Sequence, residues 1–486
     1  MAEPKRILML TNSELGQANV FLATAYELIR LDPALKLHIA SFPGLSKHVD
    51  TIRMPSSDAK DGDNVSFIAL KGPSWKEALF DRPEHQFQEL CDIQPTVWNV
   101  GSAAKMTRIA CPWTSDEVCA LVKEIEQIIQ DIAPDVVVVD NLFTPAVTIC
   151  YKLKPKWIVL SPNTYKEFVL ALQPQQQYYW KYPPPRSTIP FPVPWYYIPV
   201  VYYMVRKMYL NHEDTWMVDH AKQMKEKIDT DYADWAYISI VPPEGLQVLL
   251  ASRPEIDFPF DVVPPHITGC GPIVRPHAPL KDIDPELDDW LSLHPTVYVN
   301  TGTHATYTQE QAIELAGALK YLLQKAEKAG KKLQVLWKLN KRGDYESSLI
   351  TDVLGSELKE AVRTTNWITA EPSSILGSGQ IVCSVNHGGA NSFFEAVSAG
   401  IPQVILPVWG DTYDFAKRVE WLGIGRFGSP RNAPKCSARE LGPILESVLL
   451  GKAAVAMKQK AEDLAKVCGH TSQGRETAAR KIMEML

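Results

Sequence analysis

The segment from Ile381 to Asp411 constrains the fold of this chain more than any other, because glycines join two short apolar runs to a helix. Ile381 to Val385 has the length and composition of a buried parallel strand. Gly388 and Gly389 let the backbone turn sharply and approach a ligand closely. We expect a helix over Phe393 to Ser398 and a second strand over Gln403 to Leu406. The pattern predicts an open α/β sheet.

The same segment predicts a binding site for an anion. Asn391 and Ser392 are good N-terminal caps for the expected helix. The free amides and the dipole at a helix N-terminus favour phosphate. Trp409 and Asp411 follow the second strand, on the side where open α/β sheets bind their ligands. We therefore expect a phosphate-bearing ligand here.

Strands and helices alternate along the rest of the chain, which favours doubly wound parallel sheets. Expected helices include Asn19 to Arg30, Glu117 to Asp131, Gln309 to Ala329 and a charged C-terminal helix over Ala454 to Leu486. The expected strands are Arg6 to Thr11, Lys36 to Phe42, Asp135 to Val139, Trp157 to Leu160, Tyr237 to Val241, Thr296 to Asn300 and Leu333 to Lys338.

Size and composition narrow the classes of function. The 486 residues favour two domains, and 45% hydrophobic with 22% charged residues are typical of a globular protein. A net charge of −6 gives no reason to expect nucleic acid. The eight cysteines are scattered without a Cys-x-x-Cys pair, so we expect free thiols in a reducing compartment.

The ordered motif His387-Gly-Gly-Ala-Asn-Ser-Phe-Phe-Glu395, followed by Gly400-Ile-Pro402 and Pro407-Val-Trp-Gly-Asp411, resembles the donor signature of the family 1 UDP-glycosyltransferases. The resemblance implies the GT-B fold, in which two Rossmann-like doubly wound domains face a cleft. It divides the chain into an N-terminal acceptor-binding domain and a C-terminal UDP-sugar-binding domain. The implied bounds are residues 1–272 for the acceptor domain, 273–294 for a linker of little periodicity, 295–465 for the donor domain, and 466–486 for a helix packing back on the N-terminal domain.

The resemblance also implies roles for the donor residues. Trp367 stacks on uracil, His387 contacts the diphosphate, and Glu395 accepts both ribose hydroxyls. Gly389, Asn391 and Ser392 line the phosphate and sugar side, and Asp411 holds hydroxyls of the sugar. Thr412 departs from the glutamine of many plant members, which leaves the identity of the sugar open.

Gly302-Thr303 resembles the Gly-Ser that contacts the phosphates from the opposite side. His304 follows, and two interpretations stay open: a contact to the diphosphate, or a surface histidine on a polar loop. No Asp-x-Asp occurs in the cleft segments, so we expect no metal and no cofactor beyond the UDP-sugar co-substrate.

The catalytic base is the weakest match. Most family members carry a histidine in the first strand-to-helix turn, where this chain has Gln17, and an amide cannot take a proton at neutral pH. Asp140 occupies the place of the partner aspartate, and Glu14 is a second carboxylate in the turn. Three interpretations stay open: Asp140 as base, Glu14 as base, or an acceptor acidic enough to need little help. Asp140 could instead be an ordinary carboxylate at a strand end, and Glu14 could be a solvated carboxylate of the turn.

Gln173 to Tyr209 is rich in Tyr, Trp and Pro, which is typical of a wall around an apolar or aromatic acceptor. The alternative is an irregular surface insertion. Its apolar part, Ile189 to Val205, is shorter than the ~20 residues of a membrane-spanning helix. Contact with a membrane surface stays open. With no apolar leader before the first strand and no anchor after the last helix, we expect a cytoplasmic protein without a transmembrane segment.

The predicted function is the inverting transfer of a hexose from a UDP-sugar to a hydroxyl of a small apolar or aromatic acceptor, such as a phenolic secondary metabolite. Glucose is the favoured hexose. The missing histidine motivates one alternative, a UDP-binding partner protein without activity. A second is an epimerase acting on the nucleotide sugar alone. The sequence leaves the sugar, the acceptor and the oligomeric state open.

Overall fold

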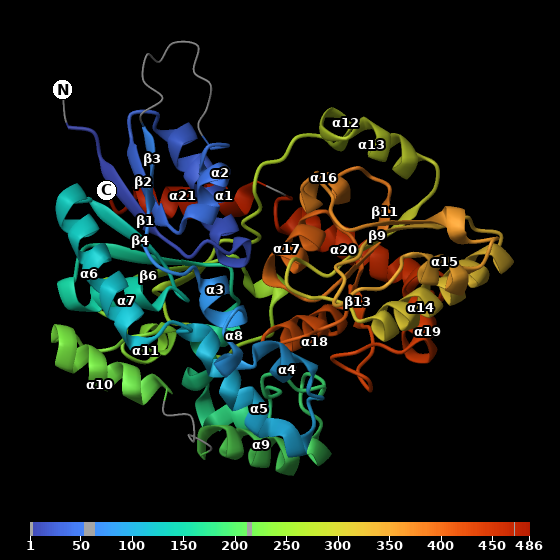
Figure 1. The fold of residues 1–486 in the computed structure, drawn as a ribbon, viewed down its shortest axis with the longest axis horizontal. Coiled ribbons are helices and arrows are strands. Elements are labelled where there is room, and N and C mark those ends of the chain that lie inside the picture. The colour runs from blue at the N-terminus through green and yellow to red at the C-terminus, as the bar shows by residue number, and fades with distance from the viewer. Residues whose placement is uncertain (1–2, 53–63, 211–215, 471) are drawn as a thin grey trace.

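The computed structural model describes residues 3–52, 64–210, 216–470 and 472–486. The chain folds into two α/β halves that lie side by side, each built around one parallel sheet (Figure 1). The two doubly wound sheets expected from the sequence are thereby confirmed.

The N-terminal sheet has seven strands in the order β3-β2-β1-β4-β5-β6-β7, and every pair is parallel. Its order reverses between β1 and β4, which are neighbours in the sheet. The four valines of β4 are fully buried, as a strand covered by helices on both faces requires. The bounds are β1 Arg6–Leu10, β2 Lys36–Ser41, β3 Val65–Ala69, β4 Val136–Asp140, β5 Trp157–Ser161, β6 Gln247–Leu250 and β7 Ile267–Gly269.

The C-terminal sheet repeats this arrangement with six parallel strands in the order β10-β9-β8-β11-β12-β13. Here the order reverses between β8 and β11. The bounds are β8 Thr296–Asn300, β9 Gln334–Lys338, β10 Val362–Thr365, β11 Ile381–Asn386, β12 Gln403–Ile405 and β13 Gly425–Phe427.

Helices cover both sheets, and side-chain caps begin several of them. In α6 and α14 a threonine before the helix and a Glu or Gln three residues later satisfy each other's backbone amides. The helices of the N-terminal half are α1 Leu15–Leu31, α2 Ser46–Val49, α3 Trp75–Phe80, α4 Phe87–Asp92, α5 Val100–Lys105, α6 Ser115–Ile132, α7 Thr144–Leu153, α8 Tyr165–Val169, α9 Ile198–Leu210, α10 Trp216–Ile228 and α11 Trp235–Ile240. The remaining helices are α12 Leu280–Ile283, α13 Pro285–Ser292, α14 Gln309–Lys328, α15 Ser348–Leu354, α16 Pro372–Leu376, α17 Ala390–Ser398, α18 Thr412–Leu422, α19 Ala438–Leu449, α20 Ala454–Val467 and α21 Gln473–Met483.

The structure corrects one predicted strand. Tyr237 to Val241 belongs to helix α11, because the side chain of Asp234 accepts the Ala236 amide at 2.9 Å and caps a helix that ends at Ile240. The aromatic and β-branched residues of this run had favoured a strand. The sheet instead resumes at β6, where Val248 to Leu250 are buried.

Several helices also differ from the expectation in where they begin or end. Helix α1 begins at Leu15, so Glu14 is its N-cap and Gln17 lies in its first turn. Helix α17 begins at Ala390 with Gly389 as N-cap, and no side chain caps it. The single helix expected over residues 454–486 is two helices, α20 and α21. The segment 273–294, expected to lack periodicity, contains α12 and α13.

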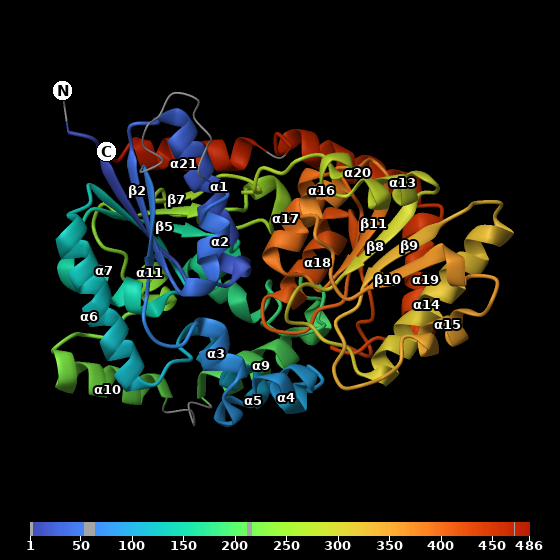
Figure 2. The same cartoon turned by 45° about the horizontal axis from the view of Figure 1, so that its top comes forward.

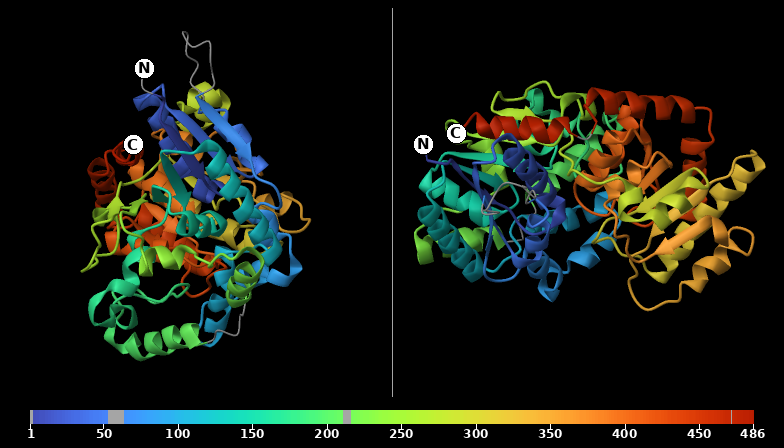
Figure 3. Two further views of the ribbon diagram at one scale, coloured as in Figure 1. Left: turned by 90° about the vertical axis from the view of Figure 1, so that its left-hand side faces the viewer. Right: turned by 90° about the horizontal axis from the view of Figure 1, so that it is seen from above.

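The chain passes between the halves twice on one side of the molecule. The first crossing follows β7, and the second joins α20 to α21, which lies against α1 (Figures 2 and 3). Arg475 of α21 contacts Glu27 of α1 at 2.9 Å and donates to the Val274 carbonyl of the first crossing at 3.2 Å. The two crossings therefore touch each other.

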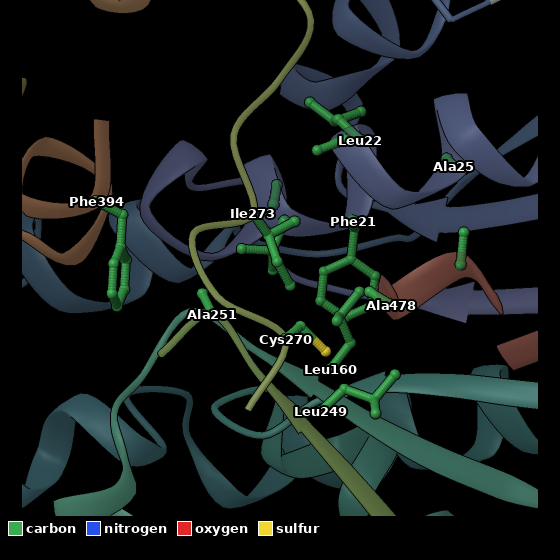
Figure 4. Close-up of a cluster of buried hydrophobic side chains, with 14 of the residues drawn as sticks. Phe21, Leu22, Ala25, Leu160, Leu249, Ala251, Cys270, Ile273, Phe394 and Ala478 are labelled. Atoms are coloured by element: carbon green, nitrogen blue, oxygen red, sulfur yellow. The ribbon is translucent and has the colours of Figure 1, made fainter. Parts of the chain in front are cut away.

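A shared apolar cluster fills the space beneath the crossings. In Figure 4, Phe21 of α1, Cys270 and Ala478 of α21 lie together, and Phe394 of the C-terminal half lies across from Ile273. Within the described ranges, no helix has the length and hydropathy to cross a membrane.

Candidate donor and acceptor site

The site lies where the reversal points of the two sheets face each other, since ligands of open α/β sheets bind outside the strand ends at that position. In each strand-end turn a polar side chain accepts a backbone amide two residues further on. Asn12 accepts Glu14 N at 2.9 Å after β1, and Asn300 accepts Gly302 N at 3.1 Å after β8. Asn386 accepts Gly388 N at 2.8 Å after β11. These bonds fix the turns that present the predicted residues.

The imidazole of His387 packs between Gly302 and Gly389. A Cβ added to Gly302 would lie 2.7 Å from His387 Cε1, and one added to Gly389 would lie 2.5 Å from Nε2. Gly302 also has φ +83°, a left-handed conformation that favours glycine. Both glycines are therefore needed for the ring to fit, and Thr303 follows directly on the same turn.

Two titratable side chains of this half, His387 and Glu395, have pKa values shifted by burial. Burial, with the charges of His304 and Lys338 nearby, lowers the pKa of His387 to about 3, so the ring is neutral at physiological pH. Burial, with Glu371 nearby, raises the pKa of Glu395 to about 8. A neutral ring N–H and a carboxylate that loses its proton on contact suit a diphosphate and a pair of hydroxyls.

Asn391 and Ser392 lie in the first turn of α17, one turn before Glu395. Asn391 Nδ2 donates to the Leu15 carbonyl of the N-terminal half at 2.7 Å. Its expected capping role is wrong, because the side chain reaches across the cleft instead of back to its own helix. Ser392 is partly buried.

Asp411 and Thr412 differ although they are neighbours. Burial, with Glu167 and Asp414 nearby, raises the pKa of the partly buried Asp411 to about 7. The Thr412 hydroxyl is buried and accepts the amides of Val408 at 3.0 Å and Trp409 at 3.1 Å. It also donates to the Trp409 carbonyl. Thr412 therefore shapes the loop, and only Asp411 of the two has a side chain free to meet a sugar.

Trp367 is 65% exposed, and Lys338 Nζ lies 4.5 Å from the centre of its ring. Lys338 also approaches the Gly302 carbonyl at 3.4 Å, and burial lowers the pKa of its ammonium group. The sequence interpretation missed Lys338 as a cation of the donor site. The signal was present, because Lys338 is the last residue of the predicted strand ending at this edge.

Asp140 lies at the end of β4 and is fully buried. Its Oδ2 accepts Thr11 Oγ1 at 3.1 Å and Asn12 Nδ2 at 3.0 Å, and its Oδ1 accepts Leu142 N at 2.9 Å. Burial raises the pKa of Asp140 to about 6, and these hydrogen bonds oppose the rise. Asp140 therefore holds Asn12, which in turn holds the backbone of Glu14.

Gln17 and Glu14 have different surroundings in the first turn. Gln17 Oε1 is buried without a hydrogen-bond partner among the described residues. Glu14 Oε2 contacts His304 Nε2 of the other half at 2.9 Å. His304, interpreted above as a diphosphate contact or a surface histidine on a polar loop, also stacks on Phe80 with 5.1 Å between ring centres.

The Tyr- and Trp-rich segment has an inner and an outer part. Arg186 N donates to the Gly410 carbonyl at 3.3 Å, next to Asp411, and its guanidinium donates to the Ile93 carbonyl at 2.6 Å. Trp195 and Tyr196, ahead of α9, are 81% and 60% exposed. The segment thus reaches the cleft at Arg186, and its outer aromatics lie on the surface.

Comparison with known proteins identifies relatives over nearly the whole chain. The family model described as UDP-glucoronosyl and UDP-glucosyl transferase matches residues 20–457. Glycosyltransferase sdnJ of Sordaria araneosa is 32% identical over 456 residues, which cover 90% of this chain and 86% of that protein. A 2-hydroxyacylsphingosine 1-beta-galactosyltransferase of Mus musculus is 30% identical over 182 residues, 36% of this chain and 29% of that protein.

Solved structures share the fold. A UDP-glucosyltransferase from Polygonum tinctorium capable of glucosylating indoxyl, in complex with 3,4-dichloroaniline, aligns with a TM-score of 0.64 at 15% identity, covering 100% of this chain and 99% of that one. Phytolacca americana UGT2, complexed with UDP-2fluoro-glucose and pterostilbene, aligns with a TM-score of 0.61 at 15% identity, covering 99% of each chain.

Proposed function

Because this chain belongs to the UDP-glucuronosyl and UDP-glucosyl transferase family, we propose that it transfers glucose from UDP-glucose to a hydroxyl of a small apolar or aromatic acceptor. Its membership makes it a glycosyltransferase that uses a UDP-sugar. The observation that carries the finer proposal is the pair of partly buried carboxylates, Glu395 and Asp411, at the ends of a site that otherwise suits a diphosphate.

The proposed donor geometry runs along α17 and the turn after β8. Glu395 accepts the ribose hydroxyls, and the amides at the start of α17 face the diphosphate with Gly302 and Thr303 opposite. His387 donates a neutral N–H, and Lys338 supplies positive charge. Uracil stacks on the Trp367 ring, on the face that Lys338 does not cover.

The proposed reaction is an in-line displacement at the anomeric carbon. The acceptor oxygen attacks as the bond to the β-phosphate breaks, and UDP leaves with the bonding electrons. The helix amides and Lys338 stabilise the charge that develops on UDP. We propose that no metal or further cofactor takes part, so activity should persist in EDTA.

The acceptor class is proposed from the apolar surface beside the turn. Phe80 and Phe87 pack edge to face with 5.1 Å between ring centres, and both belong to a cluster that includes Trp409. Aromatic walls with a few polar groups suit planar apolar ligands. The Polygonum relative, which glucosylates indoxyl, supports the same class.

The proposed compartment is the cytoplasm. All eight cysteines are free and buried, which suits a reducing environment.

The proposal is tested in two steps. Isothermal titration should detect UDP binding, and the absence of heat at millimolar UDP would contradict the donor site. A screen of UDP-glucose, UDP-galactose and UDP-glucuronate against alcohols and phenols, read by mass spectrometry, should give glucosides. UDP binding without turnover of any pair would favour a partner protein without activity, and conversion of the UDP-sugar without acceptor would favour an epimerase.

Asp411→Ala separates the sugar from the nucleotide. Its carboxyl group is proposed to contact only the sugar, so the change should lower turnover with UDP-glucose while UDP affinity stays within about twofold. Equal loss of UDP binding in Asp411→Ala and Glu395→Ala would mean that Asp411 is structural.

A further inference from the structure

The two halves present equivalent turns to each other, and these turns meet through one histidine and one carboxylate. His304 follows β8 and Glu14 follows β1, and each of these strands is the first of its sheet along the chain. His304 Nε2 and Glu14 Oε2 are 2.9 Å apart, and the two side chains are 20% and 18% exposed. A histidine oriented by a carboxylate thus exists in the cleft, although its members come from different domains.

Both members are held in place by other groups. The ring of His304 stacks on Phe80 at an interplanar angle of 17°. Glu14 is the N-cap of α1, and its amide donates to Asn12, which is held by the buried Asp140. Asp140 therefore acts on Glu14 indirectly: it holds the Asn12 side chain, and Asn12 holds the Glu14 backbone.

The contact fixes which ring nitrogen of His304 carries a lone pair. An ionised carboxylate can only accept hydrogen bonds, so Nε2 carries the proton that Glu14 accepts. Nδ1 then presents its lone pair, and the described part of the chain provides no hydrogen bond to it. A lone pair without a partner, on a ring one-fifth exposed in the cleft, is available to a substrate hydroxyl.

His304 also lies beside the donor site. It is the residue after Thr303, and it is one of the groups that lower the pKa of the neighbouring His387 ring. One face of the His304 ring is covered by Phe80 of α3. His304 thus lies between the diphosphate side of the cleft and the apolar cluster around Phe80.

We propose that His304 is the general base of the transfer, oriented by Glu14 across the domain interface. This inference rests on the proposed function. Glu14 is a positioning residue in it, and Gln17 takes no proton. Asp140, whose two oxygens are occupied by Thr11, Asn12 and Leu142, supports the turn.

The proposed transfer forms one bond to the anomeric carbon and breaks another. The acceptor oxygen forms a bond to the anomeric carbon, and the bond from that carbon to the β-phosphate oxygen breaks, with its electron pair leaving on UDP. The hydroxyl proton moves to His304 Nδ1. Glu14 offsets the charge of the resulting imidazolium, which returns its proton to water after the products leave.

The test compares acceptors of different acidity with UDP-glucose as donor. The variants are His304→Gln and Glu14→Gln, with His294→Gln as a control at a partly buried histidine of the loop before β8. The acceptors are water, benzyl alcohol and 4-nitrophenol, which is already partly ionised near neutral pH. His304→Gln should lower turnover of benzyl alcohol and water by ~10²–10⁴-fold, the range for loss of a general base, and turnover of 4-nitrophenol far less. UDP affinity should stay within about twofold.

Glu14→Gln should show a smaller loss with the same dependence on acceptor acidity. The double variant should be no slower than His304→Gln alone, because the carboxylate acts only through the imidazole. Added imidazole should partly restore His304→Ala on benzyl alcohol. Rescue and unchanged UDP affinity both require folded protein.

Other outcomes overturn the proposal. A uniform loss across the acceptors with weaker UDP binding would make His304 a diphosphate contact. Unchanged turnover of benzyl alcohol in His304→Gln would exclude it as base, and losses that add in the double variant would separate Glu14 from it. If the unmodified protein neither transfers nor hydrolyses UDP-glucose, the proposed function itself fails, and this inference falls with it.

Discussion

Charged side chains of the two halves meet in several places among the described residues, and two of these contacts differ in burial. In the first, which we name the rear contact, Arg418 of α18 contacts Asp257 at 2.9 Å, and both side chains are completely buried. In the cleft, His304 and Glu14 retain about a fifth of their exposure. The rear contact has no access for a substrate, whereas the cleft contact does.

The rear contact also holds Arg418 through several groups, although Arg418 Nη1 is buried without a hydrogen-bond partner among the described residues. Arg418 donates to Asp257 and to Thr164. Its guanidinium carbon lies 4.6 Å from the ring centre of Phe258 and 4.8 Å from that of Phe415. Lys166 adds a second buried pair with Asp414 at 2.7 Å. Charges removed from water in this way hold the halves together only while every partner is present. We therefore expect the rear contact to serve stability, and the proposed base gives the cleft contact a role in chemistry.

The largest expected effect breaks the rear contact. Arg418→Met leaves Asp257 buried without its cation and should lower the free energy of unfolding by ~3–5 kcal/mol. Urea denaturation measures the loss, and Arg431→Met, at an exposed arginine, is the matched control. A loss as small as that of the control would mean that the rear contact does not stabilise the protein.

The next effect belongs to the cleft and should appear in binding. Glu395→Ala removes the carboxylate proposed to accept two ribose hydroxyls, and hydrogen bonds to charged groups contribute ~1.5–3 kcal/mol each. Isothermal titration should show UDP affinity reduced by at least ~10-fold, without the stability loss of Arg418→Met. An unchanged dissociation constant would place the nucleotide elsewhere.

The pH dependence of UDP binding sharpens the comparison further. The pKa of Glu395 is raised to about 8 in the free protein, so the carboxyl group holds a proton below that pH and must release it to accept the hydroxyls. Affinity should therefore rise with pH, by up to ~10-fold per unit, and level off above pH 8. Dissociation constants at several pH values measure this, and Glu395→Gln should lose that part of the dependence. Equal slopes in both proteins would contradict the assignment.

The smallest expected effect is on stability at the cleft contact. His304→Gln should change the free energy of unfolding by no more than ~1 kcal/mol, because partly exposed ion pairs contribute little. The urea experiment that reports on Arg418→Met measures it. A loss approaching that of Arg418→Met would erase the distinction between the two contacts.

The C-terminal half could be predicted well because its signals are local. The β11 strand, the turn at Gly388 and α17 lie within a few residues of one another, and each has its own composition. Local signals also misled: the run at Tyr237 has residues typical of strands, but Asp234 begins a helix there. Lys338 was predictable from its position at a strand end.

The His304–Glu14 contact could not be predicted, because it joins residues 290 positions apart. Its existence depends on how the two sheets face each other, which no local pattern specifies. The same holds for Asn391, whose side chain bonds to Leu15 rather than capping its own helix. Residues that meet only across domains are thus the part of the site that sequence patterns leave out.

The two chain crossings lie on one side of the molecule, so we expect a rotation of one half against the other to turn about an axis along them. Arg475 ties one crossing to the other, and Arg253, close to Asp257 in the chain, donates to the Val467 carbonyl near the second crossing at 2.7 Å. Rotation about this axis moves nearby groups least and distant groups most. We therefore expect a small opening of the cleft to separate His304 from Glu14 before it disturbs Arg418 and Asp257. Glu14 would then orient the proposed base only while the halves lie as they do in this structure.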